Sequence, residues 1–93
     1  MPEDNKTLAQ IDEHRAQIDA IDEQLVTLLN ERACHQLAIR ALKPEAQLAL
    51  FDPKREEEIL QRAQSFNQGP LYSDNIREIF QSILKVSKEM PAE

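Results

Sequence analysis

The sequence predicts an all-α domain with one long helix and two shorter ones. Ala, Leu, Glu, Gln and Arg are abundant, whereas the 93 residues include one Gly and no Trp. The stretch from Leu8 to Lys43 contains neither Gly nor Pro and consists mostly of strong helix formers. Two shorter segments with helical apolar spacing follow it. We expect residues 1–93 to form one small domain, whose limited core makes oligomerisation a reasonable expectation.

The predicted helix Leu8–Lys43 is too long for a chain of this size. It would span roughly 54 Å, more than the width of a 93-residue globule. Its apolar residues follow a heptad pattern, in which Arg32 takes one of the a positions. Such a helix needs a packing partner along its length, which this chain is too short to supply. Residues 1–7 are polar and expected to be disordered, and Pro44 ends the helix.

The remaining sequence predicts a connection and two helices. Residues 44–51 are interpreted as a loop with apolar residues that could fold over a site. Asp52-Pro53 predicts a helix start, with Asp as the N-cap, and Gly69-Pro70 ends that helix. Ser73 is the predicted N-cap of the third helix, and Pro91 ends it. The apolar stripes of the two helices contain Ile59, Leu60, Ala63 and Phe66, and Ile76, Ile79, Phe80, Ile83, Leu84 and Met90.

The composition excludes several classes of function. A net charge of −6 disfavours nucleic acid and anionic membranes as partners, although a local group of cations can still bind a small anion. Cys34 is the single cysteine, and neither a signal peptide nor a long apolar run is evident, so a cytoplasmic location is expected. His14 and His35 are too far apart on a helix to share a metal. We therefore expect no metal or cofactor.

Three cations of the long helix suggest an anion site. Arg32 and Lys43 are 11 residues apart, about three turns, so they share a face and could bracket a small anion. Arg15 lies about 25 Å before Arg32 along a straight helix and cannot reach the same ligand within one chain. In an antiparallel two-fold pair centred near residue 26, the partner's Arg15 would fall between Arg32 and Lys43. The alternative is that Arg15 and Arg32 belong to a solvated helix face, or lie beside the apolar heptad positions with their charged ends in water.

The later segments add polar candidates. Asp52, Arg55 and Glu56 lie at the start of the second helix, where they could also be an N-cap and ordinary surface charges. The hydroxyl of Ser87 either bonds to the carbonyl four residues earlier or donates to an anionic ligand. Cys34 has no evident base beside it, so a nucleophile is not predicted. A set of several cations, a few carboxylates and one hydroxyl, without a predicted nucleophile, suits ligand binding or a reaction that needs only positioning and charge stabilisation.

Five short patterns occur in a fixed order: Arg15-x-x-Ile18-Asp19-x-x-Asp22-x-x-Leu25-x-x-Leu28-Leu29-x-x-Arg32, Ile39-x-x-x-Lys43, Asp52-Pro53-x-Arg55-Glu56, Gly69-Pro70-Leu71 and Ile79-Phe80-x-x-Ile83-Leu84-x-x-Ser87. In this order they resemble the AroQ-type chorismate mutases over about residues 8–90. The resemblance implies an intertwined homodimer with three helices per chain and two shared active sites. It also implies rearrangement of chorismate to prephenate, on the route to phenylalanine and tyrosine, without cofactor or metal.

The resemblance also implies residue roles. Arg15 of the partner chain and Arg32 would hold the substrate carboxylates with help from Ser87, and Lys43 would donate to the ether oxygen whose bond breaks. Asp52 and Glu56 would contact the ring hydroxyl region, and Arg55 would support those two residues. Three positions depart from the family: Pro91 stands where Gln or Glu is usual, Arg40 where Gly is common, and His35 where an apolar residue is common. Arg40 could add charge near the site or pair with one of the acidic residues.

Two other functions stay open at this point. Isochorismate pyruvate lyase shares the fold and many of the cations, although the Asp52-Pro53-x-Arg55-Glu56 pattern favours the mutase. A helical dimerisation or regulatory domain could bind such ligands without turnover. Pro91 keeps this last interpretation open, because it removes a side chain that would contact the ether oxygen.

Overall fold

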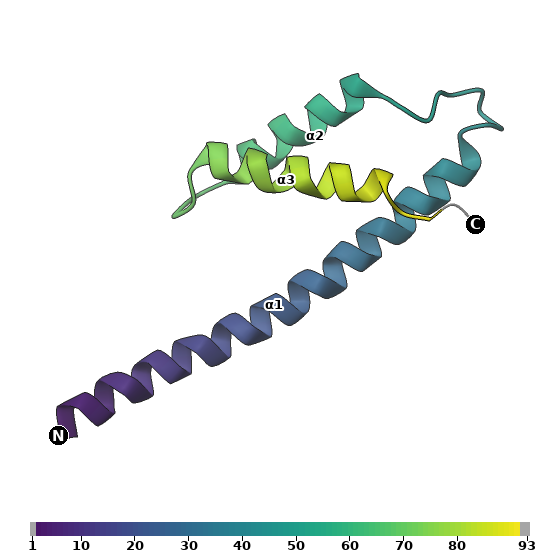
Figure 1. Cartoon of the computed structure of the whole chain (residues 1–93). Coiled ribbons are helices and arrows are strands. Elements are labelled where there is room, and N and C mark those ends of the chain that lie inside the picture. Colours follow the sequence, from purple (N-terminus) through teal and green to yellow (C-terminus); the bar gives the residue numbers. More distant parts are fainter. Residues whose placement is uncertain (1, 92–93) are drawn as a thin grey trace. The chain divides into compact units, whose positions relative to one another are not determined.

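The computed structural model describes residues 2–91, and this range contains three helices and no strand (Figure 1). They are α1 (Pro2–Leu42), α2 (Pro53–Phe66) and α3 (Ser73–Lys88). The prediction of an all-α fold with one long and two shorter helices is confirmed. The chain divides into two compact units, Met1–His35 and Gln36–Glu93. No helix within residues 2–91 combines the length and the apolar character that crossing a membrane requires.

Helix α1 begins six residues and ends one residue before the predicted positions. It starts at Pro2 rather than Leu8, so the segment expected to be disordered has helical backbone from Pro2 onward, while Met1 lies outside the described residues. Proline suits the first position of a helix because its missing N–H would have no partner there. The last helical residue is Leu42. Lys43 still donates its N–H to the Ile39 carbonyl at 2.9 Å.

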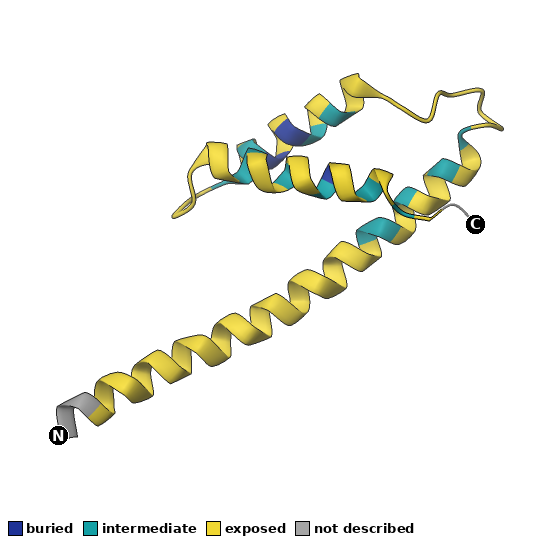
Figure 2. Cartoon of the chain, viewed as in Figure 1, coloured by how far each residue is buried: buried dark blue, intermediate teal, exposed yellow. Residues whose placement is uncertain are grey.

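In the unit Met1–His35, the apolar side chains of α1 residues 5–31 lie open to solvent. Every residue from 5 to 31 is exposed (Figure 2), and Ile18 and Leu25 are 54% and 51% exposed. A continuous series of large apolar side chains on one helix marks an interaction surface in a folded protein. The other large apolar residues exposed in this stretch are Leu8, Ile11, Ile21, Val26, Leu28 and Leu29.

In the unit Gln36–Glu93, α2 and α3 lie side by side and form a small apolar core. Leu60 and Ala63 of α2 and Leu84 of α3 are buried there. The predicted stripes supply this core, but two of their members are exposed. Phe66 is 65% exposed at the last residue of α2. Ile79 of α3 is also exposed.

The start of α2 follows the prediction. The Asp52 side chain accepts a hydrogen bond from the Arg55 N–H at 3.0 Å, and Pro53 is the first helical residue. This carboxylate satisfies a backbone donor that the first turn of a helix leaves without an internal partner. The helix ends at Phe66, just before Gly69, whose φ of +78° is a conformation that glycine adopts readily.

The start of α3 differs from the prediction by one residue. Ser73 is the first helical residue, and Tyr72 is the N-cap. The Ser73 hydroxyl accepts a hydrogen bond from Gln64 Nε2 of α2 at 3.1 Å. The oxygen that was expected to cap the first turn of α3 is therefore used in a contact between α2 and α3. Asn75 Oδ1 instead accepts the Tyr72 N–H at 3.2 Å. At its other end α3 stops at Lys88, before Pro91 is reached.

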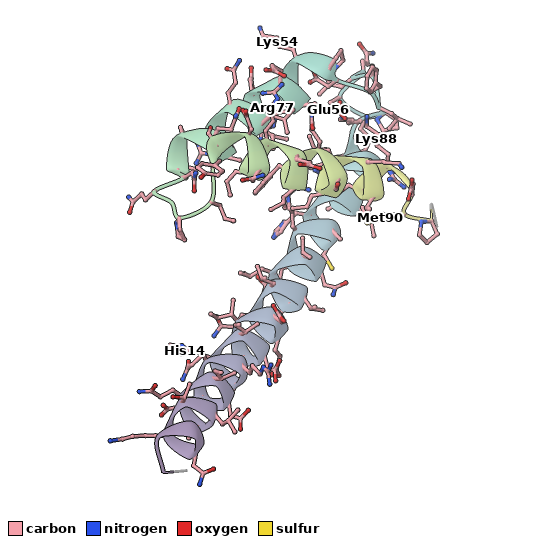
Figure 3. All side chains as sticks on the ribbon, turned by 60° about the vertical axis from the view of Figure 1, so that its left-hand side comes forward. His14, Lys54, Glu56, Arg77, Lys88 and Met90 are labelled. Carbon is pink, nitrogen blue, oxygen red and sulfur yellow. The ribbon has the colours of Figure 1, made fainter. Side chains whose placement is uncertain are left out.

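A polar bridge joins α2 and α3 on the outside of the core. The Arg77 guanidinium of α3 (labelled in Figure 3) lies 2.6 Å from Glu57 Oε2 and donates to Gln64 Oε1 at 3.1 Å. The hydrogen bond from Arg77 to the carboxylate lowers the pKa of Glu57 below its ordinary value of 4.5, since it favours the ionised form.

Glu57→Gln should therefore lower the stability of the α2–α3 unit in a pH-dependent way. A carboxyl group with a lowered folded pKa contributes stability that is complete above its unfolded pKa and is lost as pH falls through the folded value. The difference in unfolding free energy between wild type and Glu57→Gln should be largest above pH 4.5 and should shrink on acidification. Urea unfolding followed by circular dichroism at a series of pH values measures it. In an Arg77→Met background the difference should lose its pH dependence; an unchanged dependence would contradict this origin.

Candidate active site

A pocket of about 490 Å³ lies in the unit Gln36–Glu93. Its walls come from the last two turns of α1, the connecting loop, the first two turns of α2 and the C-terminal part of α3 with the residues that follow it. The volume is in the range of about 300–1,000 Å³ that is usual for small-molecule sites. The lining residues are Gln36, Ile39, Arg40, Lys43, Leu50, Phe51, Asp52, Arg55, Glu56, Ile59, Leu84, Ser87, Lys88 and Met90.

Lys43 is held by the loop that follows it. Its Nζ donates to the Leu50 carbonyl at 2.9 Å, and its own carbonyl accepts the Leu48 N–H at 2.9 Å. Gln47 has a φ of 60°, the left-handed conformation that reverses the chain within this loop. The loop thus returns toward Lys43, and Leu50 and Phe51 join the lining. The segment 44–51 is a loop, as predicted, and its last two residues are among those that line the pocket.

The first turn of α2 brings two carboxylates and a guanidinium to the pocket. Asp52 uses Oδ1 for the helix cap, so its alternative interpretation as an N-cap is correct. Glu56 is half-buried, and its Oε1 lies 2.6 Å from Lys88 Nζ of α3 (both labelled in Figure 3). Arg55 is exposed and lies 3.8 Å from Glu58, a weak ion pair at the surface.

The last turn of α3 forms another wall. The Ser87 hydroxyl donates to the Ile83 carbonyl at 2.8 Å, which is the local bond expected for a serine inside a helix. Donation to a ligand would require the hydroxyl to turn away from the Ile83 carbonyl, because a hydroxyl has one proton to donate. Lys88 Nζ lies 4.8 Å from the centroid of the Phe51 ring, so the same ammonium contacts Glu56 and an aromatic face.

Two cations of this pocket are not among the predicted site residues: Arg40, which the sequence marks only as a possible added charge near the site, and Lys88. Arg40 precedes Lys43 by three residues, and residues at that spacing are neighbours on one helix face, so the periodicity could have identified it. Lys88 directly follows Ser87, but only the packing of α2 against α3 brings it to Glu56. Counting both, four cationic side chains and two carboxylates line the pocket. It is cationic within a chain whose net charge is −6.

The predicted site residues divide between the two units. Lys43, Asp52, Arg55, Glu56 and Ser87 all line the pocket of the unit Gln36–Glu93. The other two, Arg15 and Arg32, belong to the unit Met1–His35. Arg15 is exposed and lies 3.8 Å from Asp12, one turn earlier, and Arg32 is half-buried.

The fold and the pocket define a class: an all-helical domain with a cationic site of a size that suits a small anionic ligand. The family model described as chorismate mutase type II matches residues 14–91. This chain therefore belongs to the chorismate mutase type II family.

Relatives and solved structures agree with that membership. The chain is 41% identical over 71 residues to the bifunctional chorismate mutase/prephenate dehydratase of Neisseria gonorrhoeae, covering 76% of this chain and 19% of the relative. It is 32% identical over 91 residues to the protein of the same name from Aquifex aeolicus, covering 89% and 25%. The chain thus spans a quarter or less of these curated relatives. The chorismate mutase of Thermus thermophilus (form II) matches with a TM-score of 0.83 at 34% identity, covering 87% of this chain and 92% of that one.

Proposed function

We propose that this chain is a chorismate mutase, which rearranges chorismate to prephenate on the route to phenylalanine and tyrosine. The observation that carries the proposal is the cationic pocket of the unit Gln36–Glu93, found in a chain whose residues 14–91 match the family model. We propose further that residues 1–93 act as one catalytic domain and that the protein works in the cytoplasm.

The proposed reaction makes few chemical demands on the pocket. It is a Claisen rearrangement, in which one carbon–oxygen bond breaks and one carbon–carbon bond forms within the same molecule. No nucleophile, general base, metal or cofactor is required. A site can accelerate it by holding the compact conformer and by stabilising the negative charge that develops on the ether oxygen.

In this proposal Lys43 donates to the ether oxygen. Lys43 is half-buried, and its Nζ donates a hydrogen bond to the Leu50 carbonyl. The bound substrate would replace that carbonyl as the acceptor. Exchanging one acceptor for another costs little when both are polar oxygens, and the bond to an oxygen that gains charge in the transition state is stronger. Lys43 would therefore bind the transition state more tightly than the substrate.

The other site residues would hold and orient the substrate. Arg32 and the partner's Arg15 would bind its carboxylates, with assistance from Ser87. Asp52 and Glu56 would contact the ring hydroxyl region, and Arg55 would support those two carboxylates. Pairing with Lys88 keeps the Glu56 carboxylate fixed beside the pocket, which supports a positioning role.

The proposal includes an intertwined homodimer with two shared sites. The open apolar series on α1 supports it, because a second copy of the same helix would cover such a surface. The spacing of Arg15, Arg32 and Lys43 supports it further, since an antiparallel pair brings Arg15 of one chain between the other two cations of its partner.

The test is to supply the purified protein with chorismate and, separately, with isochorismate, and to follow each substrate by absorbance. We expect chorismate to disappear and prephenate to accumulate. Loss of isochorismate with release of pyruvate, but none of chorismate, would replace the mutase by a lyase. A protein that binds chorismate without consuming it at micromolar concentration would be a ligand-binding domain.

A further inference from the structure

Arg40, near the end of α1 in the unit Gln36–Glu93, holds the last turn of α3. Its Nη2 donates to the Ser87 carbonyl at 3.0 Å, and its Nη1 donates to the Met90 carbonyl at 3.0 Å. The guanidinium is partly buried, and one planar fork spans both acceptors, which a lysine ammonium does not reproduce. Its charge also faces the negative end of the α3 dipole.

Pro91 explains why the turn needs a donor from elsewhere. If α3 continued, the Ser87 carbonyl would accept the N–H of residue 91, four positions later. Proline has no N–H, and the helix instead ends at Lys88, with the Glu89 N–H bonded to the Val86 carbonyl at 3.0 Å. Arg40 thus supplies from another helix the hydrogen bond that the backbone at residue 91 cannot make.

The turn held by Arg40 forms one wall of the pocket. Ser87, Lys88 and Met90 all line it, and Lys88 carries the ion pair to Glu56 across to α2 (Figure 3). A shift of this turn would move all three lining residues together. Displacements of about 1 Å in a catalytic site can cost about a hundredfold in rate.

We infer that Arg40 is a positioning residue: its guanidinium replaces the backbone donor that Pro91 lacks, and so fixes the Ser87–Met90 turn in the geometry that turnover requires. The rate measurement rests on the proposed function, whereas a measurement of amide exchange does not.

The experiment is a cycle of Arg40→Ala, Pro91→Ala and the double variant, measured by chorismate turnover and by hydrogen exchange of the Lys88 and Glu89 amides. Arg40→Ala should lower kcat/KM about tenfold or more and speed the exchange. Pro91→Ala alone should remain near wild type. The double variant should recover most of both losses, because the new N–H at position 91 can bond to the Ser87 carbonyl.

Two further variants separate geometry from charge and from general damage. Arg40→Lys keeps the charge without the fork and should stay impaired. Arg62→Ala removes an arginine of α2 that stacks on Phe66 outside the pocket lining, and it should leave both readouts unchanged. If Arg40→Ala does not fold, Arg40→Gln, which keeps a single donor group, takes its place in the cycle.

Three results would overturn the inference: Arg40→Ala with wild-type rate and exchange, full activity of Arg40→Lys, or a double variant as impaired as Arg40→Ala. If the wild-type chain itself does not consume chorismate, the proposed function fails, and the exchange data still decide whether Arg40 holds the turn.

Discussion

Lys43→Ala should lower kcat for chorismate by about 100- to 1,000-fold, the loss typical of removing one preorganised donor to a developing oxyanion. The proposed role confines the contribution of Lys43 largely to the transition state, so KM should change much less than kcat. Steady-state kinetics of purified protein measure both quantities. Circular dichroism and molecular mass should match wild type, because the buried core of the unit is made by α2 and α3.

Lys85→Ala provides a matched control. Lys85 lies in the last turn of α3, is exposed and is outside the pocket lining, so its removal changes the net charge equally without touching the site. Its kcat should stay within about twofold of wild type, as for most surface substitutions. A Lys43→Ala protein as active as Lys85→Ala would show that the donor to the ether oxygen lies elsewhere.

Mixing two inactive proteins should restore activity if each site takes Arg15 from one chain and Lys43 from the other. Arg15→Ala and Lys43→Ala homodimers should each be nearly inactive. A heterodimer of the two has one site with both defects and one with neither. Random association makes about half of the dimers mixed, and each mixed dimer has one intact site of its two. Activity should therefore return to about a quarter of wild type. Co-expression with two affinity tags isolates the mixed dimer for the measurement.

A second mixture gives the opposite expectation. A chain carrying both Arg15→Ala and Lys43→Ala, paired with wild type, should have no intact site, because each site receives one defect. If every chain completed its own site, this heterodimer would keep half the activity and the first mixture would stay inactive. The two mixtures together therefore distinguish shared from unshared sites.

Much of the fold could be predicted because local chemistry specifies it. Asp52-Pro53 starts α2 as expected, since the cap uses only a side chain and the next backbone donors. The same reasoning predicts Ser73 as the N-cap of α3, and there the structure differs by one residue, because Tyr72 is the N-cap. Its hydroxyl bonds to Gln64 of α2, a partner nine residues earlier that helix-start rules do not consider.

For the site as well, residues marked by local spacing could be predicted, whereas contacts that depend on how the helices pack could not. Lys43 and Ser87 could be found from helical spacing and from the interruption of an apolar face. The pairing of Glu56 with Lys88 depends on how α2 packs against α3. For Arg40 the sequence indicates only an added charge near the site or a pair with an acidic residue. Its actual acceptors are two carbonyls about fifty positions later, which carry no signature in the sequence.

The contrast between an acidic chain and a cationic pocket has a consequence for how fast a ligand arrives. The proposed substrate, chorismate, is a dianion. A chain of net charge −6 would repel it at long range, while the four cations of the pocket would attract it at short range. At 0.1 M salt, interactions between exposed charges fade beyond about 10 Å, so the remote repulsion is screened before the local attraction is. Moderate ionic strength should therefore favour the encounter, and only high salt should weaken the bound complex.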